Sequence, residues 1–126
     1  MKAYTNLKQS KKLEEFLPIE SADMYYPYFG DNKWGETARF GKALEYSGKK
    51  DVSCWSLTAL LDLLDDVVIN DEGVEYSLTI SKEEGMYYIH YHDRWEEVSD
   101  IETDCYYDLI DACYEMILEL HELNLL

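Results

Sequence analysis

The apolar pattern of residues 104–123 constrains the fold most strongly, because apolar side chains recur there at intervals of three and four. This spacing places them on one face of a helix, so the segment is predicted to form one long C-terminal helix. The candidates for its N-cap are Ser99, Asp100, Thr103 and Asp104. The predicted apolar face comprises Tyr106, Leu109, Ile110, Cys113, Met116, Ile117, Leu120 and Leu123.

The other side of this predicted helix is acidic. Its carboxylates follow one another at intervals of three and four residues and are Asp108, Asp111, Glu115, Glu119 and Glu122. Like charges four residues apart on a helix repel each other mildly, so we expect a compensating cation. That cation comes either from a basic partner protein or from the first helix, through Lys8, Lys11 and Lys12. The five carboxylates are therefore the candidate protein-binding residues, and the alternative is a solvated face that only keeps the protein soluble.

Two stretches before this helix alternate in the manner of β-strands. Residues 74–80 alternate apolar and polar side chains, and the segment SKEEG separates them from MYYIHYHDRW at residues 86–95. The two stretches predict an antiparallel hairpin over about residues 74–93. Residues 67–69 precede a turn-like segment at 70–73 and are a possible third strand.

The first half of the chain contains two further predicted helices. Residues 6–17 have apolar side chains on one face, with Thr5 or Asn6 as the cap and Pro18 as the stop. Residues 53–66 place Trp55 and four leucines at helical spacing and predict a central helix of about three turns, capped by Ser53.

Residues 25–52 are the part of the chain with the weakest pattern. The aromatic residues of segment 24–29 suit a strand, and Pro27 would confine that strand to the edge of a sheet, because proline lacks a backbone N–H. Beyond this segment the pattern predicts no further elements before residue 53, and it does not say whether the segment joins the hairpin.

Together these elements predict an α+β fold: a small antiparallel sheet, with possible extra strands, packed with an N-terminal, a central and a long C-terminal helix. A chain of 126 residues has the size of one domain, so residues 1–126 are expected to form a single domain. No segment has the apolar length of a signal peptide or a membrane span, and we expect a cytoplasmic protein. The three cysteines are an odd number, which favours reduced thiols.

The charge of the chain is unevenly distributed. Residues 1–50 carry nine Lys or Arg against seven Asp or Glu, whereas residues 51–126 carry Lys82 and Arg94 against twenty acids. The net charge of the whole chain is −16. Affinity for nucleic acid depends on Lys and Arg displacing counterions, so nucleic acid is disfavoured as a partner, with the Lys-rich N-terminal segment as the only exception.

His90 and His92 are the first candidates for chemistry, because residues two apart in a strand share one face. Two imidazoles could ligate a zinc ion, but zinc takes at least three protein ligands, and Asp93 points to the opposite face. The pattern therefore favours an ordinary strand, whose other face, with Tyr87, Ile89 and Tyr91, is buried. No cofactor or metal is expected, and a small metal-dependent enzyme using the two histidines is an alternative.

Two other residues invite a catalytic or capping interpretation. Cys54 precedes the predicted central helix, where the dipole would lower its pKa, but a free thiol beside Trp55 is more typical of a buried core. His121 stands at the end of the last helix and lacks the second histidine of the zinc-protease motif, so it favours a role at the negative helix end. No catalytic residue is predicted.

Three segments carry a resemblance to a known family: KAYTNLKQSKKLEEFLPIESADM, CWSLTALLDLL and DACYEMILELHELNLL. They resemble a family of short proteins of bacterial mobile genetic elements and prophages. The resemblance covers both ends of the chain and one central helix, and it implies a genomic context without an activity, a ligand or a catalytic residue.

The predicted function is therefore binding and not catalysis. We expect a non-catalytic accessory protein of a mobile element or prophage that binds a basic protein partner through its acidic surface. An alternative is a nucleic-acid mimic, in which spaced carboxylates imitate phosphates and occupy a DNA-binding protein. The sequence predicts neither the identity of the partner nor the oligomeric state.

Overall fold

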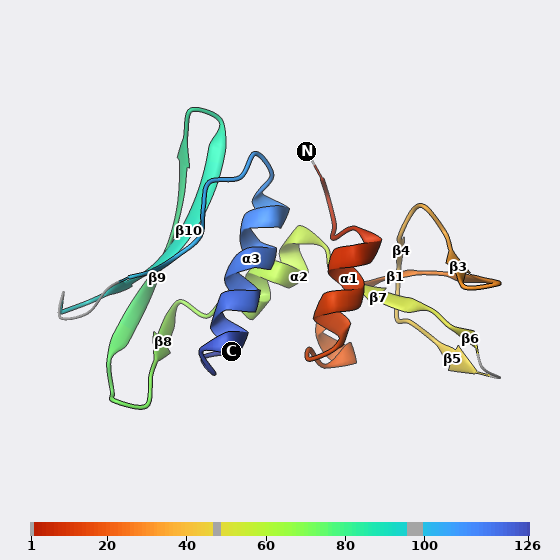
Figure 1. Ribbon diagram of the computed structural model, residues 1–126, viewed down its shortest axis with the longest axis horizontal. Coiled ribbons are helices and arrows are strands. Elements are labelled where there is room, and N and C mark those ends of the chain that lie inside the picture. Colours follow the sequence, from red (N-terminus) through yellow and green to blue (C-terminus); the bar gives the residue numbers. More distant parts are fainter. Residues whose placement is uncertain (1, 47–48, 96–99) are drawn as a thin grey trace. The chain divides into compact units, whose positions relative to one another are not determined.

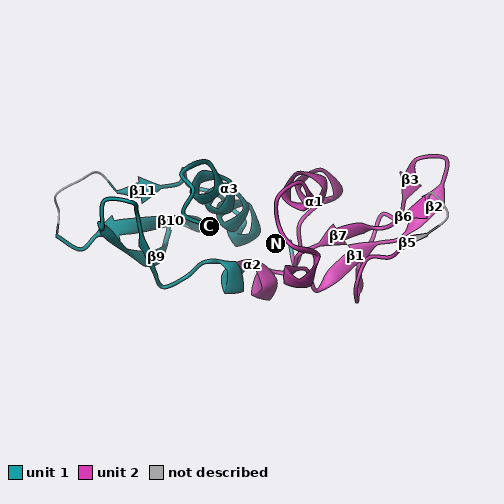
Figure 2. Ribbon diagram, turned by 90° about the horizontal axis from the view of Figure 1, so that it is seen from below, with its two compact units in different colours: residues 1–2, 61–126 teal, residues 3–60 magenta. Residues whose placement is uncertain are grey.

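The computed structural model describes residues 2–46, 49–95 and 100–126. The fold is α+β, as predicted, with three α-helices and several antiparallel sheets. The chain forms two compact units, residues 1–2 with 61–126 and residues 3–60, shown in two colours in Figure 2. The boundary falls inside helix α2 (Leu57–Leu63). The single domain over residues 1–126 stays a prediction, because two compact units can belong to one domain.

The unit of residues 1–2 and 61–126 contains the predicted hairpin. Strands β9 (Glu75–Glu83) and β10 (Met86–Asp93) are its arms, and Glu84 and Gly85 turn the chain with positive φ angles (Figure 1). The possible third strand is confirmed as β8 (Val67–Ile69), which pairs with β9. A short strand that was not predicted, β11 (Ile101–Glu102), pairs with β10, so the sheet order is β11-β10-β9-β8.

The two faces of β10 differ as its alternation predicts. Ile89 and Tyr91 are buried on one face, together with Asp93, whereas Tyr87 on the same face is half-buried and not buried as predicted. His90 and His92 are half-buried on the other face. The hydroxyl of Tyr91 donates a hydrogen bond to the carbonyl of Asp65 (2.7 Å). Burial, with the carboxylates of Asp65 and Asp66, raises the pKa of this hydroxyl, so Tyr91 stays protonated.

The C-terminal helix is confirmed, but it begins later than predicted. Helix α3 runs over Leu109–Glu122, with Asp108 at the N-cap position. The preceding residues are extended because they bond to β10: Tyr106 and Tyr87 exchange two backbone hydrogen bonds (2.6 and 2.8 Å). Cys105 therefore lies outside the helix. The predicted caps Asp100, Thr103 and Asp104 were wrong for the same reason, and Ser99 lies outside the described residues.

The unit of residues 3–60 is built from short strands and a helix. Helix α1 (Leu7–Glu14) begins at Asn6, whose side chain accepts from the N–H of Gln9 (2.8 Å) in a capping box, and a 3₁₀ turn follows at Ile19–Ser21. The strands are β1 (Met24–Tyr26), β2 (Tyr28–Gly30), β3 (Lys33–Trp34), β4 (Arg39–Phe40), β5 (Glu45–Tyr46), β6 (Lys49–Lys50) and β7 (Val52–Cys54). They form three antiparallel groups, β4-β1-β7, β2-β3 and β5-β6. Strands β3, β4, β5 and β6 lie in the segment that had no predicted elements.

Pro27 does not confine the strand before it to a sheet edge. Strand β1 is the middle strand of β4-β1-β7, and it ends at Tyr26, one residue before the proline. Strand β2 starts one residue after it. Proline therefore separates two strands, where its missing N–H interrupts no ladder.

The predicted start of the central helix was also wrong. Ser53 lies in β7, where it pairs with Tyr25 of β1, and α2 begins at Leu57. The side chain that caps the helix is Ser56, whose Oγ accepts a hydrogen bond from the N–H of Ala59 (3.2 Å). The carboxylate of Asp23 holds Ser56 in turn, by accepting from its backbone N–H (2.9 Å) and its hydroxyl.

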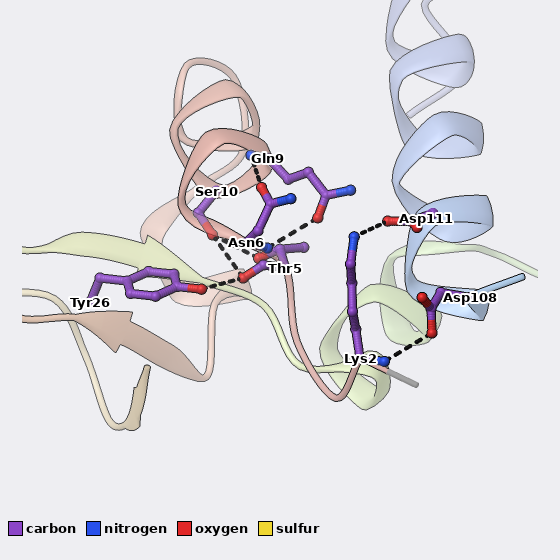
Figure 3. A network of polar contacts seen from close by, with 8 residues as sticks. All are labelled: Lys2, Thr5, Asn6, Gln9, Ser10, Tyr26, Asp108 and Asp111. Atoms are coloured by element: carbon purple, nitrogen blue, oxygen red, sulfur yellow. Dashed lines mark hydrogen bonds and ion pairs between the residues drawn. The ribbon is translucent and has the colours of Figure 1, made fainter. Parts of the chain in front are cut away.

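Thr5 is the centre of a buried polar network that joins the start of the chain to β7. Its hydroxyl bonds to Ser10 Oγ (2.7 Å) and accepts from the backbone N–H of Trp55 (3.2 Å). Its carbonyl accepts from the Tyr26 hydroxyl (2.8 Å; Figure 3). It also accepts from Cys54 Sγ (3.4 Å). Since Thr5 is fully buried, these bonds replace water for every polar atom that it brings inside.

Replacing Thr5 by valine tests this network. Thr5→Val keeps the shape of the side chain but leaves the buried N–H of Trp55 without its acceptor, so we expect a loss of about 1–3 kcal/mol in the free energy of unfolding. Urea denaturation followed by circular dichroism measures it. The matched control is Thr58→Val on the exposed side of α2, which should change stability by less than about 0.5 kcal/mol. Equal effects of the two variants would contradict the role of the network.

Candidate functional site

Four of the five predicted carboxylates lie on one side of α3, and Asp108 lies at its N-cap position. Successive residues of a helix are rotated by about 100°, so the four side chains within the helix fall in a sector of about 80°. The buried residues of α3 occupy the other side of the helix and are Ile110, Ala112, Cys113, Met116, Ile117 and Leu120. We call the row of Asp108, Asp111, Glu115, Glu119 and Glu122 the acidic stripe.

Lys2 holds the N-terminal end of the acidic stripe. Its ammonium group lies 2.8 Å from Asp111 Oδ1, and its backbone N–H donates to Asp108 Oδ1 (2.9 Å) (Figure 3). Lys2 is thus a compensating cation that the sequence did not indicate. The compensation expected from Lys8, Lys11 and Lys12 of α1 stays a prediction. Within residues 3–60, Lys11 lies over the ring of Trp34 (3.9 Å to the centroid) and Lys12 pairs with Glu15 (3.3 Å).

The middle of the acidic stripe is electrostatically strained. Burial raises the pKa of Glu115, and the carboxylates of Asp104, Asp111 and Glu119 raise it further. Tyr106 lies in the same field: burial and then Glu115 raise the pKa of its hydroxyl. Among the described residues of this unit, no Lys or Arg forms an ion pair with Glu115, Glu119 or Glu122. This part of the acidic stripe is uncompensated within its own unit.

An open hollow of about 440 Å³ adjoins the C-terminal end of the acidic stripe. We call it the acidic hollow. Its wall includes residues from β11, from the β8–β9 connection and from the end of α3. They are Asn70, Tyr76, Asp100, Ile101, Glu102, Glu119, Leu123 and Leu125. Three of the eight are acidic, none is basic, and the last turn of α3 adds the negative end of its dipole. The acidic hollow therefore favours a cationic group with an apolar stem.

Asp100, Glu102, Asp104 and Lys2 belong to this site but were not predicted for it. The segment 100–102 does alternate polar, apolar, polar around the buried Ile101, which is the signal of a short strand. Two residues of β11 are too few for that signal to stand out. Nothing in the local sequence of Lys2 indicates that it pairs with a carboxylate 109 positions away.

The histidine pair lies on the outer face of the sheet. His90 stacks on Tyr88, with ring centroids 5.7 Å apart, and its buried Nδ1 has no hydrogen-bond partner among the described residues. His92 Nδ1 lies 3.1 Å from Asp100 Oδ1. In the described part of the chain, no three His, Cys, Asp or Glu side chains are placed to hold a metal ion. Within that part of the chain the two histidines therefore have no third metal ligand, and Asp93 is buried on the other face of β10.

The cysteines are free thiols in two kinds of surroundings. Cys54 and Cys113 are buried and Cys105 is exposed. Burial raises the pKa of Cys54, and it raises the pKa of Cys113 to about 12. Both buried thiols therefore stay protonated, which is the state of a packing group and not of a nucleophile. Cys54 lies at the end of β7, and burial raises its pKa, whereas the sequence had suggested that a helix dipole lowers it.

The two compact units differ sharply in charge. Residues 1–2 and 61–126 carry nineteen Asp or Glu against three Lys or Arg, so this acidic unit holds the whole net charge of −16. Residues 3–60 carry eight acids and eight bases and are neutral. The change in charge along the sequence therefore coincides with the structural boundary, because Asp51 is the only charged residue in segment 51–60.

No protein-family model, curated protein or solved structure matches the chain. The resemblance to a family of mobile genetic elements and prophages accordingly stays a prediction. Within the described residues, no helix combines the length and the apolar character needed to cross a membrane.

Glu115→Gln tests the strain in the acidic stripe. The pKa of Glu115 is raised in the folded state, so the charged form costs stability, and this cost appears as pH rises through the folded pKa. Glutamine stays neutral, so the variant should gain about 0.5 kcal/mol in the free energy of unfolding at pH 7. The gain should vanish below about pH 4, where glutamate is protonated in both states.

The measurement is chemical denaturation at the two pH values. Glu83→Gln at the exposed end of β9 removes the same charge from the same unit and is the control. A gain at pH 7 as large as that of Glu115→Gln would mean that net charge alone is responsible.

Proposed function

We propose that this protein is a non-catalytic accessory protein that works in the cytoplasm by binding a basic protein partner through the acidic stripe of α3. The observation that carries this proposal is the segregation of charge, since one compact unit holds the entire −16 while the other is neutral. A charge distributed only for solubility has no reason to follow a structural boundary. The genomic context of a mobile element or prophage belongs to the proposal as an expectation from the resemblance alone.

The acidic stripe supplies both attraction and orientation. Uncompensated carboxylates concentrated on one face create a field that steers a basic partner and disfavours an acidic one. Glu115 and Glu119 have no described cationic partner, so contact with lysine or arginine would relieve a repulsion already present in the free protein. Relief of this repulsion would therefore contribute to the free energy of binding.

The acidic hollow gives the same surface a place for a single side chain. A lysine or arginine has an aliphatic stem and a cationic end. Leu123, Leu125 and Ile101 offer apolar wall, and Glu119, Asp100 and Glu102 offer negative charge. A basic side chain of the partner fits this combination better than an acidic or a purely apolar one.

A nucleic-acid mimic is the second candidate, favoured by the single-file geometry of the acidic stripe. Carboxylates four residues apart on a helix are about 6 Å apart along its axis. A row of negative charges at this spacing resembles one strand of a phosphate backbone more closely than a diffuse acidic surface does. In this case the partner is a DNA-binding protein whose basic groove the acidic stripe occupies.

The first test is binding of a fluorescein-labelled 20-residue peptide with eight lysines, measured by anisotropy at several salt concentrations. We expect affinity to fall as salt rises. The variant E115Q/E119Q should weaken binding about tenfold, whereas E83Q/E84Q, which removes the same charge from the β9–β10 turn, should weaken it less than about threefold. Equal losses in the two variants would mean that the whole field acts, and not the acidic stripe.

The mimic is tested by competition. A panel of purified helix-turn-helix domains is bound to labelled duplex DNA, and the protein is added at low and at physiological salt. Release of DNA from a domain by the native protein but not by E115Q/E119Q supports the mimic. Retention of DNA by every domain at both salt concentrations contradicts it and leaves a non-DNA-binding basic protein as the partner class.

A further inference from the structure

Strand β8 leaves the backbone of one sheet edge open. It is the last strand in the order β11-β10-β9-β8, and its neighbour β9 bonds to one side of it. The N–H of Leu78 donates to the carbonyl of Asp66 (2.9 Å), and the N–H of Asn70 donates to the carbonyl of Val74 (3.1 Å). In an antiparallel pair the bonded positions alternate, so Val67 and Ile69 direct their N–H and C=O groups away from β9.

The same two residues also expose their side chains. Val67 is 40% exposed and Ile69 is 59% exposed, whereas Val68 between them is 6% exposed and faces the core. The edge thus presents free backbone groups together with two β-branched side chains. Natural proteins usually protect such an edge against pairing, because its free backbone groups can bond to any extended chain.

Charge decides which extended chain can approach this edge. Asp65 and Asp66 precede β8, and Asp71 and Glu72 follow it after one residue, and all four are exposed. None of the four forms an ion pair with a described residue. A second copy of the strand would bring carboxylates against carboxylates within a unit of net charge −16, so self-pairing is repelled. A strand with basic residues at both ends is attracted.

The end of β8 also leads to the site already described. Asn70, the residue after β8, lines the acidic hollow together with Glu119 of the acidic stripe. The end of β8 therefore adjoins the acidic hollow.

We propose that β8 is the docking edge for an extended segment of the basic partner, which adds a strand to the sheet through Val67 and Ile69. The segment has β-branched or apolar residues at its centre and lysine or arginine at both ends, to match Asp65 and Asp66 on one side and Asp71 and Glu72 on the other. Main-chain hydrogen bonds supply the docking, and the charges supply the selection. This inference rests on the proposed function and names the shape of the partner.

The test uses the peptide KKITVKK with a fluorescent label, titrated with the full-length protein at low salt. Two N-methylated forms remove the backbone donors from one edge of the peptide or from the other, at its third and fifth or its fourth and sixth residues. Only one edge faces β8, so one form should lose about thirtyfold or more in affinity and the other less than about threefold. Equal binding by the two forms would overturn strand addition, because a purely electrostatic contact does not distinguish them.

Protein variants locate the contact. D66N/D71N should weaken the unmodified peptide about tenfold, whereas the control E83Q/E84Q, with the same loss of charge at the far turn, should weaken it less than about threefold. Amide NMR signals of Val67 and Ile69 should shift on titration. Unchanged signals for both residues would overturn the proposal even if the peptide binds.

The outcomes separate this inference from the proposed function. Suppose that E115Q/E119Q weakens binding of the lysine-rich peptide, while the two methylated forms of KKITVKK bind equally well. This result would support binding by the acidic stripe and would overturn β8 as the docking edge. If neither peptide distinguishes its variants from E83Q/E84Q, both proposals fail. A concentration-dependent dimer in sedimentation analysis that protects the amides of β8 would instead show that a second copy occupies the edge, and would overturn the basic segment as its occupant.

Discussion

Mutual repulsion among carboxylates is the constraint under which the acidic unit folds. Nineteen acids and three bases cannot be distributed so that every charge finds a partner. The unit manages this by keeping its acids away from the buried side of α3, where every position is apolar or a thiol. The cost of repulsion is then borne at the surface, where water screens it, and the apolar stripe of the helix supplies the opposing stabilisation.

The three basic residues of this unit show how the constraint is met locally. Lys2 bridges Asp108 and Asp111 at the start of α3, where the helix dipole already favours negative charge. Arg94 pairs with Glu75 across the sheet (3.1 Å), and Lys82 lies near the ring of Tyr87. Compensation is therefore found at the N-terminal end of the acidic stripe, while its middle and C-terminal end, with Glu115 and Glu119, stay strained. The strained part is the part that adjoins the acidic hollow.

Most of the fold could be predicted from local periodicity, and the errors fall at residues that pair with distant segments of the chain. The hairpin, β8 and the apolar face of α3 follow from side-chain spacing, so the sequence predicted them correctly. Ser53 was assigned to a helix because its neighbours have helical spacing, and only its pairing with Tyr25 makes it a strand residue. Tyr106 was assigned to α3 for the same reason, and its bonds to Tyr87 hold it extended. The local spacing of side chains does not indicate which distant residue each of them pairs with.

The residues of the candidate site fall into the same two groups: those predictable from local spacing and those placed by contacts between distant segments. The five carboxylates of the acidic stripe were predictable, because a helix places residues three and four apart on one face. Lys2 and Glu102 were not, since they join the site through contacts between distant segments. The open edge of β8 was predictable only in part. The sequence indicated the strand, but only the strand order shows that no described strand of this unit pairs with its other side.

The raised pKa of Glu115 links the strain in the acidic stripe to the binding we propose. A cation brought close to Glu115 favours its charged form and so lowers the pKa that burial and its acidic neighbours have raised. Binding of a basic partner and loss of this proton then support each other, because each is easier once the other has happened. In a solvated charged face with no partner, the repulsion around Glu115 would lower stability without contributing to binding. The uncompensated middle of α3 therefore fits a surface that is completed by another molecule better than it fits a surface made for water alone.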